Sequence, residues 1–518
     1  MTSCSMANRV HKSLMNAKVG FTFYFLSIFI AFFSRRIFLE CLGDQFIGLT
    51  GTLGSILNLL NITEVGIGTC IGYFLYKPIE QGDKEKICEI VSLFGWMYRI
   101  IGSIIVCGGI IISLFFPIIF AKEITEENIN LSIVYFAFFS FLASNIIGYF
   151  INYRQIILDS DQKTYKISIW TQTCGTIKTI VQIILAYYYK NLYLWVIVEF
   201  VFSLIICWIL NHVINKEYPW LKTDKNQGRF IIKKYPEILI KVKQIIVHRL
   251  KNVLLSRCDE VFIYSFESLQ MVTFYGNYTM IVGKLTALFN NVLVGMNASI
   301  GNLIAEGNQQ NIKKVFWEFV TFRYWTTGVF IIGLSFLINP VINWWLGPQY
   351  ILENHIVFLI LLNMYIMLTR PSVDLFINAY GLYSDVWAAY AEGFINLIVT
   401  LVFGDLYGIV GILLGKIVSM FFLVVLWKPY YLFRDGFKRG VYIYWKNILI
   451  HITILTLCLI MMQIATLYLN WEITPTLWGI ISFALCFTIP AIIIYSLCIY
   501  IFCPGAKDLI YRLPIHQQ

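Results

Sequence analysis

Charged residues are scarce in this sequence: Asp, Glu, Lys and Arg make up 13% of 518 residues, about half the share of a soluble domain. Hydrophobic residues make up 58%, and the mean hydropathy is +0.72. A soluble chain of this length needs far more polar surface, so the composition excludes a soluble globular protein. The twelve cysteines form no CxxC pair and the six histidines show no metal-ligand spacing. We therefore expect neither a metal nor another cofactor.

Long apolar runs recur along the whole chain. A helix needs about 20 apolar residues to cross a bilayer. The runs predict an all-α polytopic membrane protein with about fourteen transmembrane helices. The predicted spans are 19–40, 46–76, 88–118, 131–153, 166–187, 193–214, 252–267, 272–304, 316–341, 354–379, 383–403, 407–428, 446–469 and 476–503.

The net charge of +10 comes from basic residues in short segments between the spans, which argues against a nucleic-acid partner. If the N-terminus is cytoplasmic, the outward loops contain only two basic residues, Lys122 and Lys190. The inward segment 215–251 holds ten, and the inward segment 428–446 holds five. Since Lys- and Arg-rich loops stay in the cytoplasm, we predict that both termini are cytoplasmic. The outward loops are too short for a catalytic domain, and we expect a transport protein, not an enzyme.

The chain contains a weak internal repeat. The stretch 34–36 is similar to 256–258, so that Arg35 corresponds to Arg257, and the stretch 80–87 is similar to 306–313. Chance similarity between apolar helices is the alternative reading. An even number of helices per copy makes the two copies parallel. The predicted domains are a six-helix lobe at 1–214, a basic cytoplasmic connector at 215–251, a second six-helix lobe at 252–430, and two extra helices with the tail at 431–518.

Basic residues lie inside the predicted spans, where each costs about 3 kcal/mol near the bilayer centre. Arg99, Arg323 and Lys416 lie near span ends, and we expect them to extend to the interface. For Arg35 and Arg36 we expect no acidic partner on their own span, which predicts an anionic ligand such as a phosphate. The full set is Arg35, Arg36, Arg99, Lys178, Arg257, Lys284, Arg323, Arg370 and Lys416.

Acidic residues inside the spans give two groupings. Arg370 and Asp374 are four residues apart and share a helix face, next to a kink predicted at Pro371. A structural ion pair and a ligand site are both open there. The other grouping adds Asp259 and Glu260 to Arg257. The acidic residues in spans are Glu64, Glu199, Asp259, Glu260, Asp374, Asp385 and Glu392.

Several short motifs follow one another in the order found in a known family. The sequence resembles the Wzx-type flippases of bacterial polysaccharide biosynthesis (O-antigen, capsule or exopolysaccharide) over nearly its whole length. Next to Asp259, this chain has Cys258 and Glu260 where that family usually has a small polar residue and Asn. The motifs are Asn61-Ile62-Thr63-Glu64-Val65-Gly66-Ile67-Gly68, Tyr76-Lys77-Pro78, Tyr218-Pro219-Trp220-Leu221, Asp259-Glu260-Val261-Phe262-Ile263-Tyr264-Ser265 and Tyr275-Gly276-Asn277-Tyr278.

The resemblance implies membership of the MOP superfamily, together with MATE exporters and the lipid II flippase. Such proteins have two six-helix lobes in a V around a partly cationic cavity. The implied function is to carry undecaprenyl-diphosphate-linked oligosaccharides across the bacterial inner membrane for lipopolysaccharide or exopolysaccharide synthesis. The implied partners are this lipid-linked substrate, membrane lipids and the polysaccharide polymerase machinery.

Guanidinium and ammonium groups bind diphosphates. We therefore predict that five cationic residues bind the substrate: Arg35, Arg36, Arg257, Lys284 and Arg370. Coupling of transport to H⁺ or Na⁺ would need a carboxylate in a span. The candidates are Glu64, Asp259 and Asp374.

Two other function classes are weighed against a flippase. A MATE-like drug or cation antiporter requires a mainly acidic cavity, whereas basic residues outnumber acidic ones in these spans. A membrane glycosyltransferase, polymerase or ligase generally presents catalytic groups on sizeable loops, and the outward loops here are short. A flippase is the favoured function; the sugar unit, the coupling ion and the oligomeric state stay open.

Overall fold

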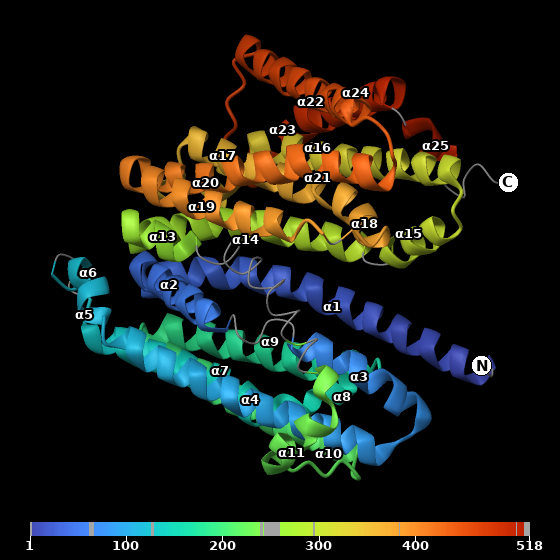
Figure 1. Ribbon diagram of the computed structural model, residues 1–518. Coiled ribbons are helices and arrows are strands. Elements are labelled where there is room, and N and C mark those ends of the chain that lie inside the picture. Colours follow the sequence, from blue (N-terminus) through green and yellow to red (C-terminus); the bar gives the residue numbers. More distant parts are fainter. Residues whose placement is uncertain are drawn as a thin grey trace. The chain divides into compact units, whose positions relative to one another are not determined.

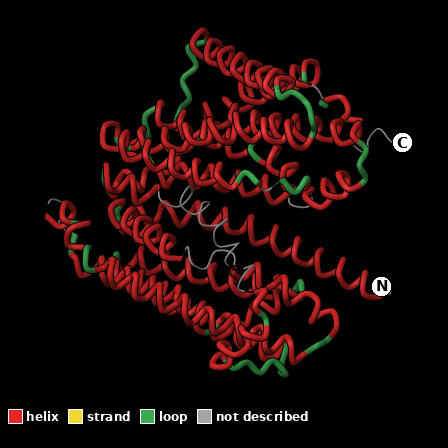
Figure 2. The backbone as a smooth tube through the Cα atoms, in the orientation of Figure 1, coloured by secondary structure: helices red, strands yellow, loops and turns green. Residues whose placement is uncertain are grey.

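The computed structural model describes residues 3–61, 67–125, 129–238, 242, 259–293, 296–382, 384–503 and 505–511. Within these ranges every regular element is a helix and none is a strand (Figure 2). The chain divides into two compact units, Met1–Thr273 and Phe274–Gln518, here called the N-terminal and C-terminal units. The predicted all-α polytopic fold is confirmed.

The N-terminal unit combines long helices with short ones that follow them in the chain (Figure 1). Its elements are α1 (Ser3–Leu42), α2 (Asp44–Leu60), α3 (Ile67–Gln81), α4 (Lys84–Ser113), α5 (Phe116–Ile119), α6 (Ala121–Thr125), α7 (Leu131–Phe150), the 3₁₀-helix η2 (Asn152–Gln155), α8 (Ile156–Ser160), α9 (Thr164–Tyr189), α10 (Leu192–Glu217), η3 (Lys225–Gln227), α11 (Gly228–Lys234) and α13 (Asp259–Phe266).

The C-terminal unit contains the remaining helices, and the division at Thr273 falls inside the first of them. The elements are α14 (Leu269–Leu293), α15 (Met296–Ala305), α16 (Gln309–Leu346), η4 (Pro348–Tyr350), α17 (Asn354–Thr369), α18 (Pro371–Ala379), α19 (Val386–Tyr407), α20 (Ile409–Met420), the π-helix η5 (Phe421–Trp427), α21 (Lys428–Tyr431), the π-helix η6 (Leu432–Gly436), α22 (Tyr442–Tyr468), α23 (Leu477–Phe483), the π-helix η7 (Ala484–Thr488), α24 (Ile489–Phe502) and α25 (Ala506–Tyr511).

Among the described residues, ten helices are long and apolar enough to cross a membrane. Each coincides with one of the fourteen predicted spans. The four other predicted spans correspond to α9, to α13, and to the pairs α2 with α3 and α14 with α15. Between the members of each pair lie residues outside the described ranges. The count of fourteen therefore stays a prediction, as does the division of the chain into two lobes, a connector and two extra helices.

Polar caps and glycine place the turns between the long helices. The side chains of Asn130 and Asn191 accept hydrogen bonds from backbone N–H groups at the starts of α7 and α10, which stabilises these helix ends. Gly408, between α19 and α20, has φ +54° and ψ −132°, a conformation that L side chains rarely adopt. Asn130 and Asn191 fall in loops that are predicted to face outward. Gly408 lies two residues beyond the end of a third loop of this kind.

Proline interrupts one of the predicted spans. α17 ends at Thr369 and α18 begins at Pro371, because proline lacks the N–H that would continue the helical hydrogen bonds. The helix is thus interrupted at the position where a kink was predicted, at Pro371. The interruption gives Arg370 its place between two helix segments.

The first part of the basic connector packs against α4. A methyl group at Gly228 would lie 2.2 Å from Trp96 Cβ, so the backbone of α11 approaches this ring closely. Lys234 Nζ lies 2.6 Å from Glu89 Oε1, and Tyr235 OH donates to Glu89 Oε2 at 2.7 Å. The described part of the connector is thus held against α4 within the N-terminal unit.

Candidate functional site

A cavity of about 500 Å³ lies among α1, α2, α7 and α10 of the N-terminal unit. Among its lining residues, Arg35 and Glu199 are the charged ones, and Thr50, Asn58, Ser144 and Asn145 are polar. The others are Ile47, Gly51, Gly54, Leu57, Phe141 and Trp195. A polar, charged cavity inside an apolar helix bundle is costly, so its residues are candidates for function.

Arg35 is half-buried, and its Nη2 donates a hydrogen bond to the backbone oxygen of Thr273 at 3.1 Å. A carbonyl oxygen is a neutral acceptor, so this contact orients the guanidinium without cancelling its charge. Thr273 Oγ1 in turn donates to the backbone oxygen of Asp44 at 2.6 Å. The position of Arg35 at the cavity is therefore fixed by the backbone oxygen of Thr273 on α14, and the side chain of Thr273 is bound to the start of α2.

Glu199 reaches the cavity from α10 with its charge already matched. Lys178 Nζ on α9 lies 2.5 Å from Glu199 Oε1. Gln182, whose side chain is 2% exposed, donates from Nε2 to Glu199 Oε2 at 3.1 Å and to the backbone oxygen of Trp195 at 3.2 Å. Hydrogen bonds and an opposite charge offset the desolvation of the carboxylate. Glu199 thus lies at the same cavity as Arg35 with its charge matched by Lys178.

Trp195 provides a hydrogen-bond donor at the same cavity. Its ring packs edge-on against Phe38 and Phe46, with centroid distances of 5.8 and 5.7 Å. Its indole N–H is buried and has no acceptor among the described residues. A buried donor without an acceptor is costly, unless a ligand or water supplies an oxygen.

Arg36 lies differently from its neighbour. Its Nε is 2.8 Å from Glu40 Oε1, and both side chains are more than half exposed. The expectation that Arg36 has no acidic partner on its own span is wrong, because Glu40 lies one helical turn further along α1. Arg36 is not among the residues that line the cavity with Arg35.

Arg370 and Asp374 come together as their spacing predicted. Arg370 Nε lies 2.9 Å from Asp374 Oδ2. Arg370 Nη1 and Nη2 also donate to the two oxygens of Glu392 at 2.8 and 3.3 Å, and Glu392 is 2% exposed. One guanidinium thus binds two carboxylates on α18 and α19. This arrangement favours a structural ion pair over a substrate contact at Arg370.

The other predicted site residues are dispersed. Lys284 is half-buried on α14 in the C-terminal unit, and Asp259 is the first residue of α13. Glu260, next to Asp259, accepts a hydrogen bond from the Ser55 hydroxyl. Glu64 and Arg257 lie outside the described residues. In the described ranges, no group of three or more His, Cys, Asp or Glu side chains is placed to hold a metal ion.

The expectation that Arg323 extends to the membrane interface is wrong. Arg323 is 3% exposed, and its Nη1 donates to Asn290 Oδ1 at 3.0 Å and to the backbone oxygen of Leu368 at 3.2 Å. The rings of Phe289 and Phe319 lie 4.9 and 5.4 Å from the guanidinium carbon. Cation–π contacts and a carbonyl acceptor stabilise the charge inside the C-terminal unit.

The pairing of Lys178 with Glu199 was not predicted from the sequence. Both were identified as charged residues in spans, but on different helices. A signal was present: they lie at similar distances along the chain from the turn at Lys190, which has φ +47°. Antiparallel neighbours joined by a short turn bring such positions side by side.

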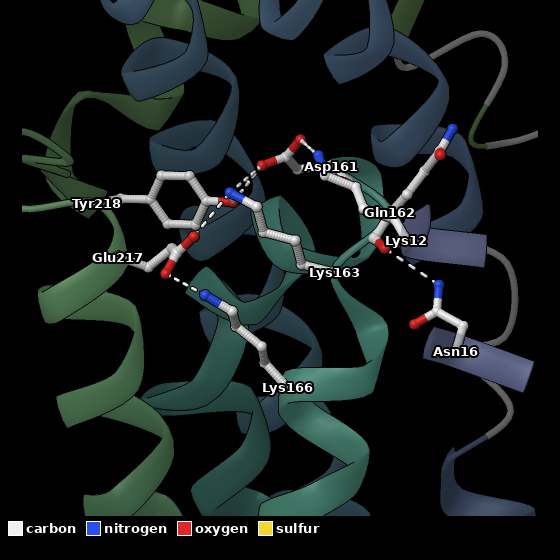
Figure 3. Close-up of polar contacts among 8 residues, drawn as sticks. All are labelled: Lys12, Asn16, Asp161, Gln162, Lys163, Lys166, Glu217 and Tyr218. Atoms are coloured by element: carbon white, nitrogen blue, oxygen red, sulfur yellow. Dashed lines mark hydrogen bonds and ion pairs between the residues drawn. The ribbon is translucent and has the colours of Figure 1, made fainter. Parts of the chain in front are cut away.

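A cluster of polar side chains joins the start of α1 to the turn between α8 and α9 and to the end of α10 (Figure 3). Lys12 Nζ lies 2.8 Å from Asp161 Oδ1, and Lys163 Nζ lies 2.7 Å from Asp161 Oδ2. Tyr218 OH donates to the same oxygen at 2.7 Å. Lys163 also lies 2.7 Å from Glu217 Oε1. The cluster fastens three segments that are distant in sequence.

The turn held by this cluster has an unusual backbone. Gln162 has φ +59°, in the left-handed region. Asn16 Nδ2 donates to the backbone oxygen of Gln162 at 3.1 Å, and Asn16 Oδ1 accepts from the N–H of Tyr165 at 2.7 Å (Figure 3 labels the first pair). These bonds from α1 stabilise the turn in its strained conformation.

Replacing Asp161 with Asn is expected to lower the free energy of unfolding by about 2 kcal/mol at neutral pH, since hydrogen bonds to a charged group are lost. Burial alone would raise the pKa of Asp161, but Lys12, Lys163 and Tyr218 outweigh it and hold this pKa below its ordinary value. The contribution is therefore present above the unfolded-state pKa and is lost as pH falls through the folded-state pKa.

Thermal unfolding of purified wild type and Asp161→Asn over a pH series measures this effect. The difference between the two proteins should shrink as the pH falls. The matched control is Asp405→Asn, since Asp405 is exposed at the end of α19. A difference that stays constant down to acid pH would contradict the role given to the Asp161 carboxylate.

Comparisons with known proteins bear on the fold. No family model matches the sequence, and no curated protein matches it. The solved structures that are similar to the chain include two transporters. One is the lipid II flippase MurJ in an inward closed conformation, with a TM-score of 0.67 and 14% identity, covering 96% of this chain and 100% of that one.

The other is a multidrug resistance MATE family transporter of the MOP superfamily in an inward-facing conformation. Its TM-score is 0.54 at 14% identity, covering 79% of this chain and 95% of that one. At this identity the likeness concerns the fold alone. The chain is a multi-pass membrane protein with the helical fold of these transporters.

Proposed function

We propose that the protein is a flippase that carries undecaprenyl-diphosphate-linked oligosaccharide units across the bacterial inner membrane for surface polysaccharide synthesis. The observation that carries the proposal is the position of Arg35 at the polar cavity of the N-terminal unit. The fold shared with a lipid II flippase supports it, because that protein also acts on a lipid-linked molecule.

The chemistry of the cavity fits a diphosphate joined to a sugar. Arg35 offers a positive charge and a planar donor fork for phosphate oxygens. Asn58 and Asn145 offer amide groups, and Trp195 has a buried N–H without an acceptor in the described structure. Lys178 balances Glu199, which lowers the repulsion between this carboxylate and an anionic ligand.

The experiment is complementation of a deletion strain, with surface polysaccharide and membrane protein level as readouts. Arg35→Ala is expected to reduce export about 10- to 100-fold, since a charge-assisted hydrogen bond contributes about 1.5–3 kcal/mol. Arg35→Lys should retain part of the activity because it keeps the charge. Arg36→Ala is the matched control: it removes the adjacent arginine, which is exposed and paired with Glu40.

Two outcomes would count against the proposal. Normal export by Arg35→Ala at normal protein level would exclude a cationic role of this cavity. A deletion strain that becomes hypersensitive to cationic drugs, without accumulating lipid-linked units, would indicate a MATE-like antiporter instead. Accumulation of lipid-linked units without drug hypersensitivity is the result expected for a flippase.

A further inference from the structure

A second cavity, of about 420 Å³, lies elsewhere in the N-terminal unit, among α3, α4, η2 and α8. It shares no lining residue with the Arg35 cavity. In the orientation predicted from the loop charges, the residues of η2 and α8 belong to the cytoplasmic side of the membrane. The function proposed above makes no use of this cavity.

The lining of this second cavity is aromatic and acidic. Four aromatic side chains contribute: Tyr76, Phe94, Tyr98 and Tyr153. Asp159 is the acidic residue, and the lining residues that the structure describes include no Lys, Arg or His. The faces of aromatic rings are negative and attract cations. The chain as a whole has a net charge of +10, whereas this cavity is lined by groups that attract cations.

The charge of Asp159 is not cancelled by a neighbouring base. Within the described part of the chain, Asp159 forms no ion pair, and the side-chain hydrogen bond that it accepts from Thr164 leaves its charge in place. The nearest lysine along the chain, Lys163, is paired with Asp161 and Glu217. The carboxylate therefore remains available to a cation that enters the cavity.

The walls of the cavity are fixed before any ligand arrives. Tyr153 OH lies 2.7 Å from Thr223 Oγ1, and the rings of Phe94 and Tyr98 are 4.0 Å apart. The backbone oxygen of Asp159 accepts from the N–H of Gln162 at 3.1 Å. That turn is the one held by the cluster in Figure 3. A preformed site spends little free energy on ordering its residues when it binds.

We propose that this cavity binds an alkylammonium cation, through the carboxylate of Asp159 and the faces of Tyr76, Tyr98 and Tyr153. Aromatic side chains around an ammonium group, with one carboxylate for its charge, are the general recognition mode for such cations. Two sources share this chemistry: the amine headgroup of a phospholipid in the inner leaflet, and a soluble alkylamine.

Binding of choline to purified protein in phosphatidylglycerol nanodiscs, measured by calorimetry, tests the proposal. Choline is expected to bind about tenfold more tightly than its uncharged isostere, in which carbon replaces nitrogen. Addition of phosphatidylethanolamine to the nanodiscs separates the two sources. Weaker apparent choline binding would identify the lipid headgroup as the ligand, and unchanged binding would identify a soluble amine.

Variants assign the binding to this cavity. Asp159→Asn and Tyr76→Leu should each weaken choline binding about five- to tenfold. Tyr76 is 57% exposed, so its replacement leaves the helix packing intact. Glu472→Gln, at an exposed carboxylate of the C-terminal unit, is the control and should bind choline like the wild type.

Equal binding of choline and its isostere would overturn the proposal, as would undetectable binding of choline to the wild type. Unchanged choline binding by both Asp159→Asn and Tyr76→Leu would overturn it too. The thermal unfolding midpoint of each variant is measured alongside. If Asp159→Asn does not fold, the result for Tyr76→Leu decides.

Discussion

Replacement of Arg370 with alanine is expected to remove most of the protein from the membrane. The substitution leaves Glu392, which is 2% exposed, as a buried carboxylate without its bidentate partner, and it also unpairs Asp374. Breaking a buried ion pair by removing one partner costs about 3–5 kcal/mol. That loss is a large fraction of the stability of a typical domain. The measurement is the membrane level of the variant and its thermal unfolding midpoint.

Two further variants sharpen this test. Arg434→Ala removes an arginine whose partner Asp435 is adjacent and whose side chain is half exposed; exposed pairs contribute about 0–1 kcal/mol, so its effect should be small. The double variant Arg370→Ala with Glu392→Gln should recover part of the lost stability, since the buried charge is removed with its partner. Normal accumulation of Arg370→Ala with loss of transport would instead support the substrate-binding role predicted from the sequence.

Replacement of Gly411 with alanine is expected to disrupt the packing of α20 against α19. A methyl group there would lie 1.9 Å from the backbone oxygen of Phe403. The obstacle is backbone, which cannot rotate away, so the two helices must separate at the Gly408 turn. Overpacking costs about 1–3 kcal/mol and more where backbone is displaced. We expect a lower thermal unfolding midpoint and less protein in the membrane.

The matched control for this prediction lies on α19 itself. A methyl group at Gly393 would meet nothing within 4 Å, so Gly393→Ala should be neutral or stabilise the helix by up to about 1 kcal/mol. Gly415, one turn after Gly411, provides a second test, since its methyl group would lie 2.3 Å from Thr400 Oγ1. Equal unfolding midpoints for Gly411→Ala and Gly393→Ala would show that the close approach does not matter.

The helical fold could be predicted from the sequence because membrane spans are a local property of the chain. Each span satisfies its own backbone hydrogen bonds, so about 20 apolar residues suffice to identify it. The predicted span 166–187, which corresponds to α9, is more polar. α9 contains Lys178 and Gln182, and its hydropathy is too low for it to count among the ten spanning helices. The structure shows why those residues are tolerated: both contact Glu199.

The candidate site was less predictable, since its contacts join distant residues. Arg35 was identified as a buried cation, but nothing in the sequence pairs it with Thr273. The burial of Arg323 depends on Phe289 and on Leu368, which come from other helices. The pair of Arg36 with Glu40 is the exception, because a spacing of four residues on one helix is a local signal.

The hydrogen bond between Arg35 and Thr273 also has a consequence for biosynthesis. The two residues are 238 positions apart, and chains elongate at about 5–20 residues per second. Arg35 therefore waits roughly 10–50 seconds after its own synthesis before this acceptor exists. During that interval Arg35 on α1 lacks this hydrogen bond. The helix must therefore insert into the membrane without a contact that stabilises it in the finished protein. Elongation rate, and not only sequence, then sets how long the nascent chain is exposed to quality control.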